Sequence, residues 1–346
     1  MKAGNLIKTC SLLVCITLAG AGLAGCSTAK KAEEAAAPAA GAKLSGKLVV
    51  YSAGPKELAE KIQKGFESKT GVKVEMFQGT TGKILSRIQA EKANPVVDVV
   101  VLASLPAAQG LKKDGQTLAY KNAQNAEKLI ADWSDRDGHF FGYSASALGI
   151  VYNTKLVKNP PQDWSDLTKE EWRGKVNIPD PAQSGSALDF ITGYLSGQGE
   201  AGWQLFDQYK QNGVVVAGAN QEALDPVITG AKSIVAAGVD YMTYQAKAKG
   251  EPVDMLYPKS GTVISPRPAA IIQTSKNTDN AKAFIDYLLS DEVQNMVADT
   301  YLLPGRSDIK AKDRASANQI PLLKIDWAWM DANGDAVVKK FSVMFK

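Results

Sequence analysis

The chain has 346 residues, of which 45% are hydrophobic and 22% are charged, and its formal net charge is +4. This composition excludes a chain that is disordered throughout, because it supplies enough apolar side chains for sizeable cores. The positive excess is too small and too dispersed to predict a nucleic-acid-binding protein. The length predicts about two domains of roughly 150 residues each.

The first 25 residues resemble a secretory signal peptide. Lys2 and Lys8 form a basic start, and residues 11–18 are mostly apolar. This apolar run is shorter than the roughly 20 residues that a membrane-spanning helix needs. The four residues that end at Cys26 read Leu-Ala-Gly-Cys and resemble the lipobox of bacterial lipoproteins, in which the cysteine becomes the lipid-modified first residue. We therefore expect a protein of the cell envelope, anchored outside the cytoplasm through a lipid on Cys26.

The cysteine count agrees with a lipoprotein. Cys10 and Cys15 lie in the predicted signal peptide, and Cys26, the third and last cysteine, would carry the lipid. The mature chain would then have no free thiol and no disulfide, which excludes a thiol enzyme and a cysteine-ligated zinc site. The alanine-rich residues 26–46 predict a tether between the lipid and the folded part.

Short strands alternate with amphipathic helices in the first part of the mature chain. Residues 47–52 and 72–77 predict strands, and a helix is predicted to begin near Pro55 between them. A second helix follows Gly82, and residues 96–102 form the nearly continuous apolar run that is typical of a parallel strand covered on both faces. This βαβαβ order predicts an α/β domain whose ligand binds beyond the carboxyl ends of the strands.

The rest of the chain predicts a second α/β unit and a return to the first. Residues 141–153 form an extended stretch that suits a crossing between two lobes, Asp225-Pro226 predicts a helix start, and residues 280–298 carry apolar side chains at helical spacing. We expect residues 47–147 and 266–310 in the first lobe, 148–265 in the second, and 311–346 as a C-terminal helical segment.

Several strings follow one another in a recognisable order: YSAG, VVDVVVLAS, GIVYNTKLV, WRGKVNIPDPAQSGSA and YLLPGRSD. In this order they resemble the extracellular solute-binding proteins of ABC importers, in the branch that includes binders of ferric ion, sugar phosphates and 2-aminoethylphosphonate. The resemblance covers essentially the whole mature chain. It implies the two-lobed type II periplasmic-binding-protein fold, with a mostly parallel sheet and flanking helices in each lobe. It also implies a solute between the lobes and a closed form that is presented to a membrane permease and its ATPase.

Ferric ion is an alternative solute that the resemblance leaves open. Ferric members of the family use a His and a Glu early in the chain and an adjacent pair of tyrosines late in it, which are hard ligands for a hard cation. Here the early segment reads Ser52-Ala-Gly54, and the single His139 lies far away. Tyr241 and Tyr244 are separated by two residues, and they are the candidate ligands if the solute is ferric ion. No resident metal or cofactor is expected.

Hydroxyls and glycines stand at the starts of three predicted helices. A helix N-terminus exposes unpaired N–H groups and partial positive charge, and glycine lets an oxyanion approach the backbone. Three such ends facing one cleft would bind an anion, with a phosphate- or phosphonate-bearing compound favoured. The alternative is that the hydroxyls are ordinary N-caps, worth about 1 kcal/mol each to their helices. The candidates are Ser52, Gly54, Thr80, Thr81, Gly82, Ser184, Gly185 and Ser186.

Four further residues are candidates for ligand contact, each with a structural alternative. Tyr241 and Tyr244 could stack on or hydrogen-bond to a ligand, or could pack at a lobe edge. Arg267 could form a bidentate pair with phosphate or carboxylate, or could lie on the surface. Asp240 could bind a cationic amine of the ligand or cap a turn.

The chain has no P-loop, no HExxH motif and no cysteine nucleophile, so the sequence does not predict an enzyme. We expect a monomeric receptor that captures a small anionic solute and delivers it to an ABC permease. A surface adhesin or a sensor lipoprotein on the same fold is an alternative from another class, and a hydrolase of phosphate esters is a third.

Overall fold

A computed structural model of the chain describes residues 44–346. The predicted signal peptide, Cys26 and the tether up to residue 43 lie outside the described residues. Within the described part, no helix combines the length and the apolar character that would let it cross a membrane.

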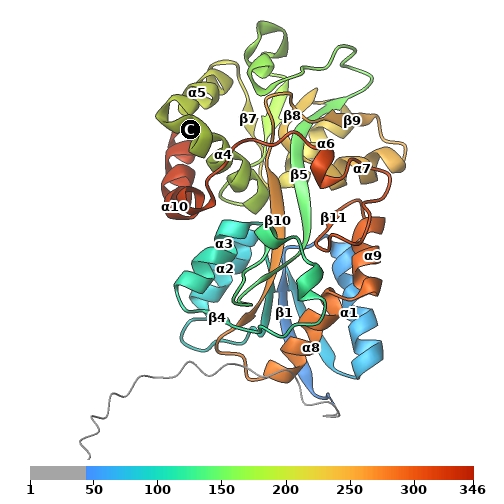
Figure 1. The fold of residues 1–346 in the computed structure, drawn as a ribbon. Helices are drawn as coiled ribbons and strands as arrows, with labels where there is room; N and C mark the ends of the chain where they lie inside the picture. The colour runs from blue at the N-terminus through green and yellow to red at the C-terminus, as the bar shows by residue number, and fades with distance from the viewer. Residues whose placement is uncertain (1–43) are drawn as a thin grey trace, which may run out of the picture. The chain divides into compact units, whose positions relative to one another are not determined.

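The first half of the described chain builds a sheet with helices packed against it (Figure 1). Strand β1 pairs in parallel with β2 on one side and with β3 on the other, so the predicted βαβαβ opening is confirmed. Helix α1 buries Leu58, Ile62 and Phe66, and it ends at Gly71, whose φ of 75° only glycine adopts without strain. The elements are β1 (Lys47–Ser52), α1 (Lys56–Thr70), β2 (Lys73–Gln78), α2 (Thr81–Ala90), β3 (Val99–Val101), α3 (Leu105–Lys113) and β4 (Thr117–Leu118).

Two long strands, β5 (Phe141–Asn153) and β10 (Ile264–Ile272), run antiparallel to each other, and β5 continues from the first sheet into a second. Residues 141–147 of β5 pair with β10 in the first sheet, whose order is β2-β1-β3-β10-β5. Residues 148–153 of β5 pair instead with β8 and β9 in the second sheet. We use "lobe 1" for residues 44–147 and 264–310, which build the first sheet, and "lobe 2" for residues 148–263, which build the second.

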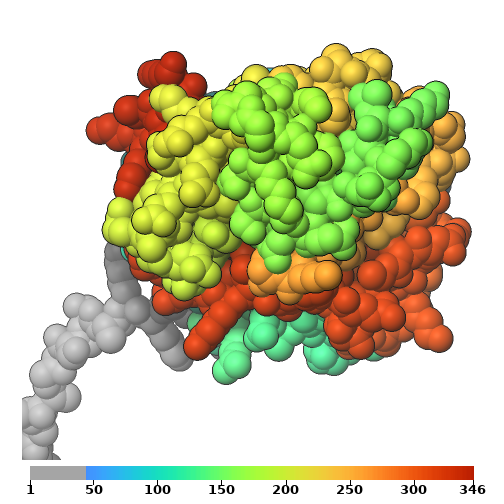
Figure 2. Space-filling model, turned by 90° about the horizontal axis from the view of Figure 1, so that it is seen from above, coloured from blue at the N-terminus to red at the C-terminus, as the bar shows by residue number. Residues whose placement is uncertain are grey.

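Lobe 2 has a second α/β arrangement. Its sheet runs β5-β8-β6-β7, with β6 parallel to both of its neighbours and β5 antiparallel to β8. The predicted α/β class is therefore confirmed. Each sheet is mixed because one long strand, β10 in the first sheet and β5 in the second, runs antiparallel to its neighbours. In the view from above (Figure 2), the green and yellow segments of this lobe occupy the middle of the face. The elements are β6 (Val176–Ile178), α4 (Gly185–Gln198), α5 (Trp203–Gln211), β7 (Val215–Val216), α6 (Asn220–Thr229), β8 (Ile234–Val239), α7 (Asp240–Ala248) and β9 (Val253–Leu256).

Two helix predictions need correction. Helix α6 begins at Asn220, so Asp225-Pro226 is not its start and Pro226 lies inside the helix. The predicted helix over 280–298 is two helices, α8 (Thr278–Leu288) and α9 (Asp291–Asp299), because the Ser290 side chain accepts a hydrogen bond from the Val293 N–H and caps a new helix.

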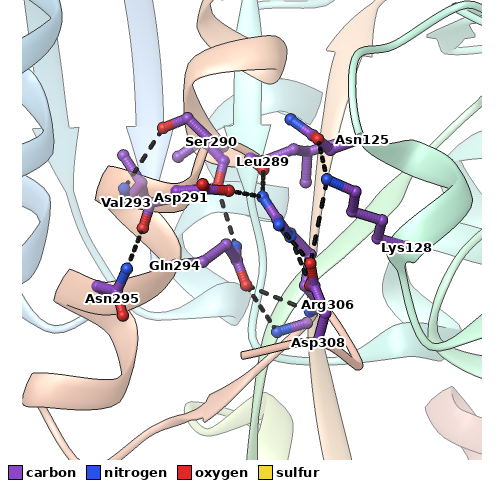
Figure 3. Close-up of polar contacts among 12 residues, drawn as sticks. Asn125, Lys128, Leu289, Ser290, Asp291, Val293, Gln294, Asn295, Arg306 and Asp308 are labelled. Atoms are coloured by element: carbon purple, nitrogen blue, oxygen red, sulfur yellow. Dashed lines mark hydrogen bonds and ion pairs between the residues drawn. The ribbon is translucent and has the colours of Figure 1, made fainter. Parts of the chain in front are cut away.

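The chain returns from α9 to β5 through β11 (Leu303–Pro304), and a polar cluster secures this return (Figure 3). The buried Arg306 guanidinium donates to the Leu289 carbonyl and to the carboxylates of Asp291 and Asp308. Gln294 accepts hydrogen bonds from the backbone N–H groups of residues 305 and 306 through its Oε1. Every charged group of this cluster therefore has a partner within it.

The last helix, α10 (Trp327–Met344), is the only α-helix within the predicted C-terminal helical segment, which otherwise contains one short 3₁₀ turn. Asp326 caps it by accepting from the N–H groups of residues 328 and 329. The helix packs against α4 of lobe 2 and against α3 of lobe 1 (Figure 1). It therefore contacts helices of both lobes.

Candidate functional site

A cavity of about 240 Å³ lies between the two lobes. Lobe 1 contributes the loop after β1, the start of α2, the loop after β3 and strand β10. Lobe 2 contributes the starts of α4, α6 and α7. The predicted site residues that line the cavity are Thr80, Thr81, Ser184, Gly185, Ser186, Tyr241 and Arg267.

Two of the hydroxyls cap a helix and line the cavity at the same time. Thr80 Oγ1 accepts from the Lys83 N–H at 3.4 Å at the start of α2, and Ser184 Oγ accepts from the Ala187 N–H at 3.1 Å at the start of α4. The two roles that the sequence left as alternatives are thus compatible. Because the N-termini of α2, α4, α6 and α7 all border the cavity, their partial positive charges add there.

The starts of α2 and α4 lie against each other across the lobe boundary. Thr81 Oγ1 accepts from the Ala103 N–H at 3.0 Å, and a Cβ built on Gly185 would lie 2.9 Å from that same Oγ1. A Cβ built on Gly82 would lie 2.5 Å from the Ala182 carbonyl oxygen. Both positions therefore require glycine for the lobes to approach this closely, and the lobes are closed at this edge. Gly82 borders this contact and is not part of the cavity lining.

A short hydrogen-bonded network fixes the lobe 2 wall. Ser184 Oγ donates to Asn220 Oδ1 at 2.9 Å, and Asn220 Nδ2 donates to Ser186 Oγ at 3.1 Å. The Ser186 hydroxyl proton remains available to Ser184, 3.1 Å away, or to a solute. The wall is thus preorganised to offer hydroxyl donors to an anion.

Arg267 is the dominant charge in the site. It is 1% exposed, and its Nη1 donates to the Ala53 carbonyl at 3.0 Å, while its Nε has no partner among the described residues. Its guanidinium lies over the Tyr241 ring, 5.2 Å from the centroid. A buried charge normally requires an opposite charge and satisfied hydrogen bonds, and no carboxylate pairs with Arg267 in residues 44–346. Burial also raises the pKa of the Tyr241 phenol, so that phenol is neutral and can donate.

Ser52 and Gly54 do not line the cavity, although Ala53 between them does. Ser52 Oγ accepts from the Gly54 N–H at 3.1 Å and so holds the loop that presents the Ala53 carbonyl to Arg267. The side chain of His139 lies elsewhere, with Nδ1 3.0 Å from Thr117 Oγ1.

Asp240, which is buried, and Tyr244, which is half-buried, lie in a separate cluster. The Asp240 carboxylate forms an ion pair with Arg314 and accepts from the Ala147 N–H and the Tyr257 hydroxyl. Tyr244 stacks on Tyr301, with ring centroids 6.0 Å apart. These contacts give Asp240 and Tyr244 packing roles, and neither residue borders the cavity.

Sequence reasoning missed Asn220 and Glu222, which also line the cavity. Asn220 follows the Gly218 turn at a helix start, and this position in the sequence could have indicated a binding residue. No sequence signal indicated Glu222, because a glutamate in the first turn of a helix is common simply because it stabilises the helix dipole. Within residues 44–346, no group of three or more His, Cys, Asp or Glu side chains could hold a metal ion.

Comparison with known proteins identifies the family. The model of the bacterial extracellular solute-binding proteins matches residues 94–333. The chain belongs to this family. This solute-binding protein is 25% identical over 256 residues to a putative 2-aminoethylphosphonate-binding periplasmic protein of Salmonella typhimurium, covering 72% of this chain and 74% of that one.

Two further similarities involve other solutes. This solute-binding protein is 24% identical over 296 residues to iron uptake protein A1 of Synechocystis sp., with 81% of each chain covered. The structure of the periplasmic binding protein AfuA from Actinobacillus pleuropneumoniae, with fructose-6-phosphate bound, superposes with a TM-score of 0.80 at 23% identity, covering 87% of this chain and 98% of that chain. The superposition confirms the predicted type II periplasmic-binding-protein fold.

Proposed function

We propose that this protein captures a small anion that carries a phosphate or phosphonate group, holds it between its lobes and delivers it to an ABC permease and its ATPase. The observation that carries the proposal is the buried Arg267, which has no ion-pair partner among residues 44–346 and lies in a cavity bordered by four helix N-termini. An oxyanion placed there would satisfy the free Nε, accept from Ser186 and the Tyr241 phenol, and lie in the field of the helices. The names of the Salmonella and Actinobacillus relatives support a phosphorus-containing solute.

The cellular setting is part of the proposal. We propose a lipid anchor on Cys26 that keeps the receptor beside the permease, with no catalytic step of its own. Incubation with phosphate esters should release no inorganic phosphate.

Ferric ion is the second candidate, because the Synechocystis relative is named for iron uptake. Tyr241 is the one tyrosine of the predicted pair that borders the cavity. A ferric site would require its phenol to ionise, against the direction in which burial shifts its pKa.

Calorimetry on the purified full-length protein in detergent tests the proposal. We expect saturable heat with 2-aminoethylphosphonate or fructose 6-phosphate. Heat with ferric citrate alone, accompanied by a visible tyrosinate charge-transfer band, would replace the phosphonate proposal with the ferric one.

A further inference from the structure

Two charged side chains line the cavity among the described residues, and they have opposite signs. Arg267 lies on β10 and belongs to lobe 1, whereas Glu222 lies in the first turn of α6 in lobe 2. Neither forms an ion pair with another group in residues 44–346. A solute between the lobes therefore meets an unpaired cation on one side and an unpaired carboxylate on the other.

The backbone around Glu222 is arranged to accommodate its side chain. Gly218 has a φ of +52°, and a Cβ built there would lie 3.0 Å from Glu222 Cβ and 3.5 Å from its carboxyl carbon Cδ. The glutamate thus lies against the Gly218 turn, where a larger residue would displace it. Glu222 is exposed at the rim, so its carboxylate is accessible to a solute that enters the cavity.

The two buried acids near the lobe boundary are already engaged and do not border the cavity. Asp240, which the sequence nominated for a cationic amine, is paired with Arg314. Asp189 accepts from the hydroxyls of Ser104 and Ser265. Of the acidic side chains in the described chain, Glu222 alone lines the cavity.

We propose that Glu222 is the specificity-determining residue that binds a positively charged amine of the solute. This deepens and rests on the proposed function: the phosphonate or phosphate group binds at Arg267, and an ammonium group at the other end of the same small molecule faces Glu222. The preferred solutes are then small zwitterions rather than simple anions. A carboxylate that faces the anion without an intervening ammonium would repel it, so the same residue also discriminates against solutes that lack the amine.

The test compares two ligands that differ only in the amine, 2-aminoethylphosphonate and ethylphosphonate, by calorimetry on the full-length protein. We expect the wild type to prefer the aminophosphonate by about tenfold, as for a charge-assisted hydrogen bond at a partly solvated site. Glu222→Gln should reduce this preference to less than about twofold. Asp225→Asn is the matched control: it removes an exposed carboxylate from the same helix, outside the cavity, and should keep the full preference.

The outcomes separate the inference from the proposed function. If the wild type binds both phosphonates equally, or if Glu222→Gln keeps the preference, the role of Glu222 is overturned while phosphonate binding stands. If neither phosphonate nor fructose 6-phosphate binds to the wild type, the proposed function itself fails, and the inference fails with it. Circular dichroism melting of each variant checks that the exposed substitutions leave the fold intact.

Discussion

Two arginines are buried where the lobes meet, and their surroundings differ in one decisive respect. The Arg314 side chain is 0% exposed and is paired with the equally buried Asp240. Its other donors reach the Tyr301 and Ala315 carbonyls. Arg267 is almost as buried, yet among residues 44–346 it has a single backbone acceptor and forms no ion pair with a carboxylate.

The difference separates a structural charge from a binding charge. The Arg314 ion pair joins the segment that leaves lobe 1 to the start of α7 in lobe 2. Arg267 instead borders the cavity between the lobes. Burial of an arginine therefore says little about function until its acceptors are counted.

The first prediction tests whether Arg314 has a structural role, and it concerns the largest expected effect, a loss of stability. Arg314→Met leaves the Asp240 carboxylate buried without its counter-ion, so we expect the free energy of unfolding to fall by about 3–5 kcal/mol. Urea denaturation followed by circular dichroism measures it. Adding Asp240→Asn to this variant should recover much of the loss. A loss below about 1 kcal/mol in Arg314→Met would mean that Asp240 is not a structural anchor.

The second prediction tests whether Arg267 has a binding role: its substitution should lower the affinity for the solute without lowering stability. Arg267→Met removes the group that pairs with the anion, so we expect affinity for 2-aminoethylphosphonate to fall by about 3 kcal/mol, or more than 100-fold. The stability of the empty protein should stay the same or rise, because an uncompensated buried charge is removed. Calorimetry and urea denaturation on the same sample report both quantities. A variant that unfolds early and still binds would reverse the assignment of the two arginines.

The sequence predicted this architecture well where local rules control it. Alternating strands and amphipathic helices were sufficient for the β1–β3 part of lobe 1, and the glycine and hydroxyl residues at helix starts correctly indicated Thr80 and Ser184 as caps. The prediction of one helix over residues 280–298 failed because Ser290 could be recognised as the cap of a second helix only in the folded structure.

The candidate site was harder to predict because long-range pairing decides it. Nothing near Asp240 in sequence indicates that Arg314, 74 residues away, will occupy its carboxylate. Arg267 lies between two prolines and resembles a surface residue, although every residue of its strand, β10, is buried. The tertiary structure determines which charged side chains are left without partners, so residue spacing along the sequence cannot predict them.

A third prediction uses the buried carboxylate of Asp189, which joins α4 of lobe 2 to Ser104 and Ser265 of lobe 1. Burial raises the pKa of this carboxyl from 3.8 to about 7, against the hydrogen bonds from both serines and the positive charge of Arg267. The folded protein therefore holds a proton that the unfolded chain releases, and the resulting stabilisation is full below pH 4 and is lost as pH rises through 7.

Between pH 5 and pH 8 this one group should lower the free energy of unfolding by about 2.5 kcal/mol. Asp189→Asn cannot ionise, so the difference between variant and wild type should shift in favour of the variant by that amount over the same interval. Urea denaturation at both pH values measures it. Parallel pH profiles for the two proteins would show that Asp189 is already ionised at pH 5.

The last prediction concerns the smallest expected effect, a modest loss of solute affinity. It tests the contact between the lobes at Gly82, where an added Cβ would meet a carbonyl of the opposite lobe. Gly82→Ala places a methyl group 2.5 Å from the Ala182 oxygen if nothing moves, so the lobes must separate slightly or shift. We expect affinity for the solute to fall by about 1 kcal/mol, roughly fivefold, with no loss of stability, because alanine favours a helix over glycine. Gly110→Ala in α3 is the matched control, since its Cβ would make only an ordinary contact of 3.5 Å with Asp331.

Small-angle scattering of the loaded Gly82→Ala protein should show a less compact particle than the wild type. If affinity and compactness are both unchanged, the starts of α2 and α4 do not meet in the loaded form, and Arg267 would have to hold the solute without the lobe 2 hydroxyls.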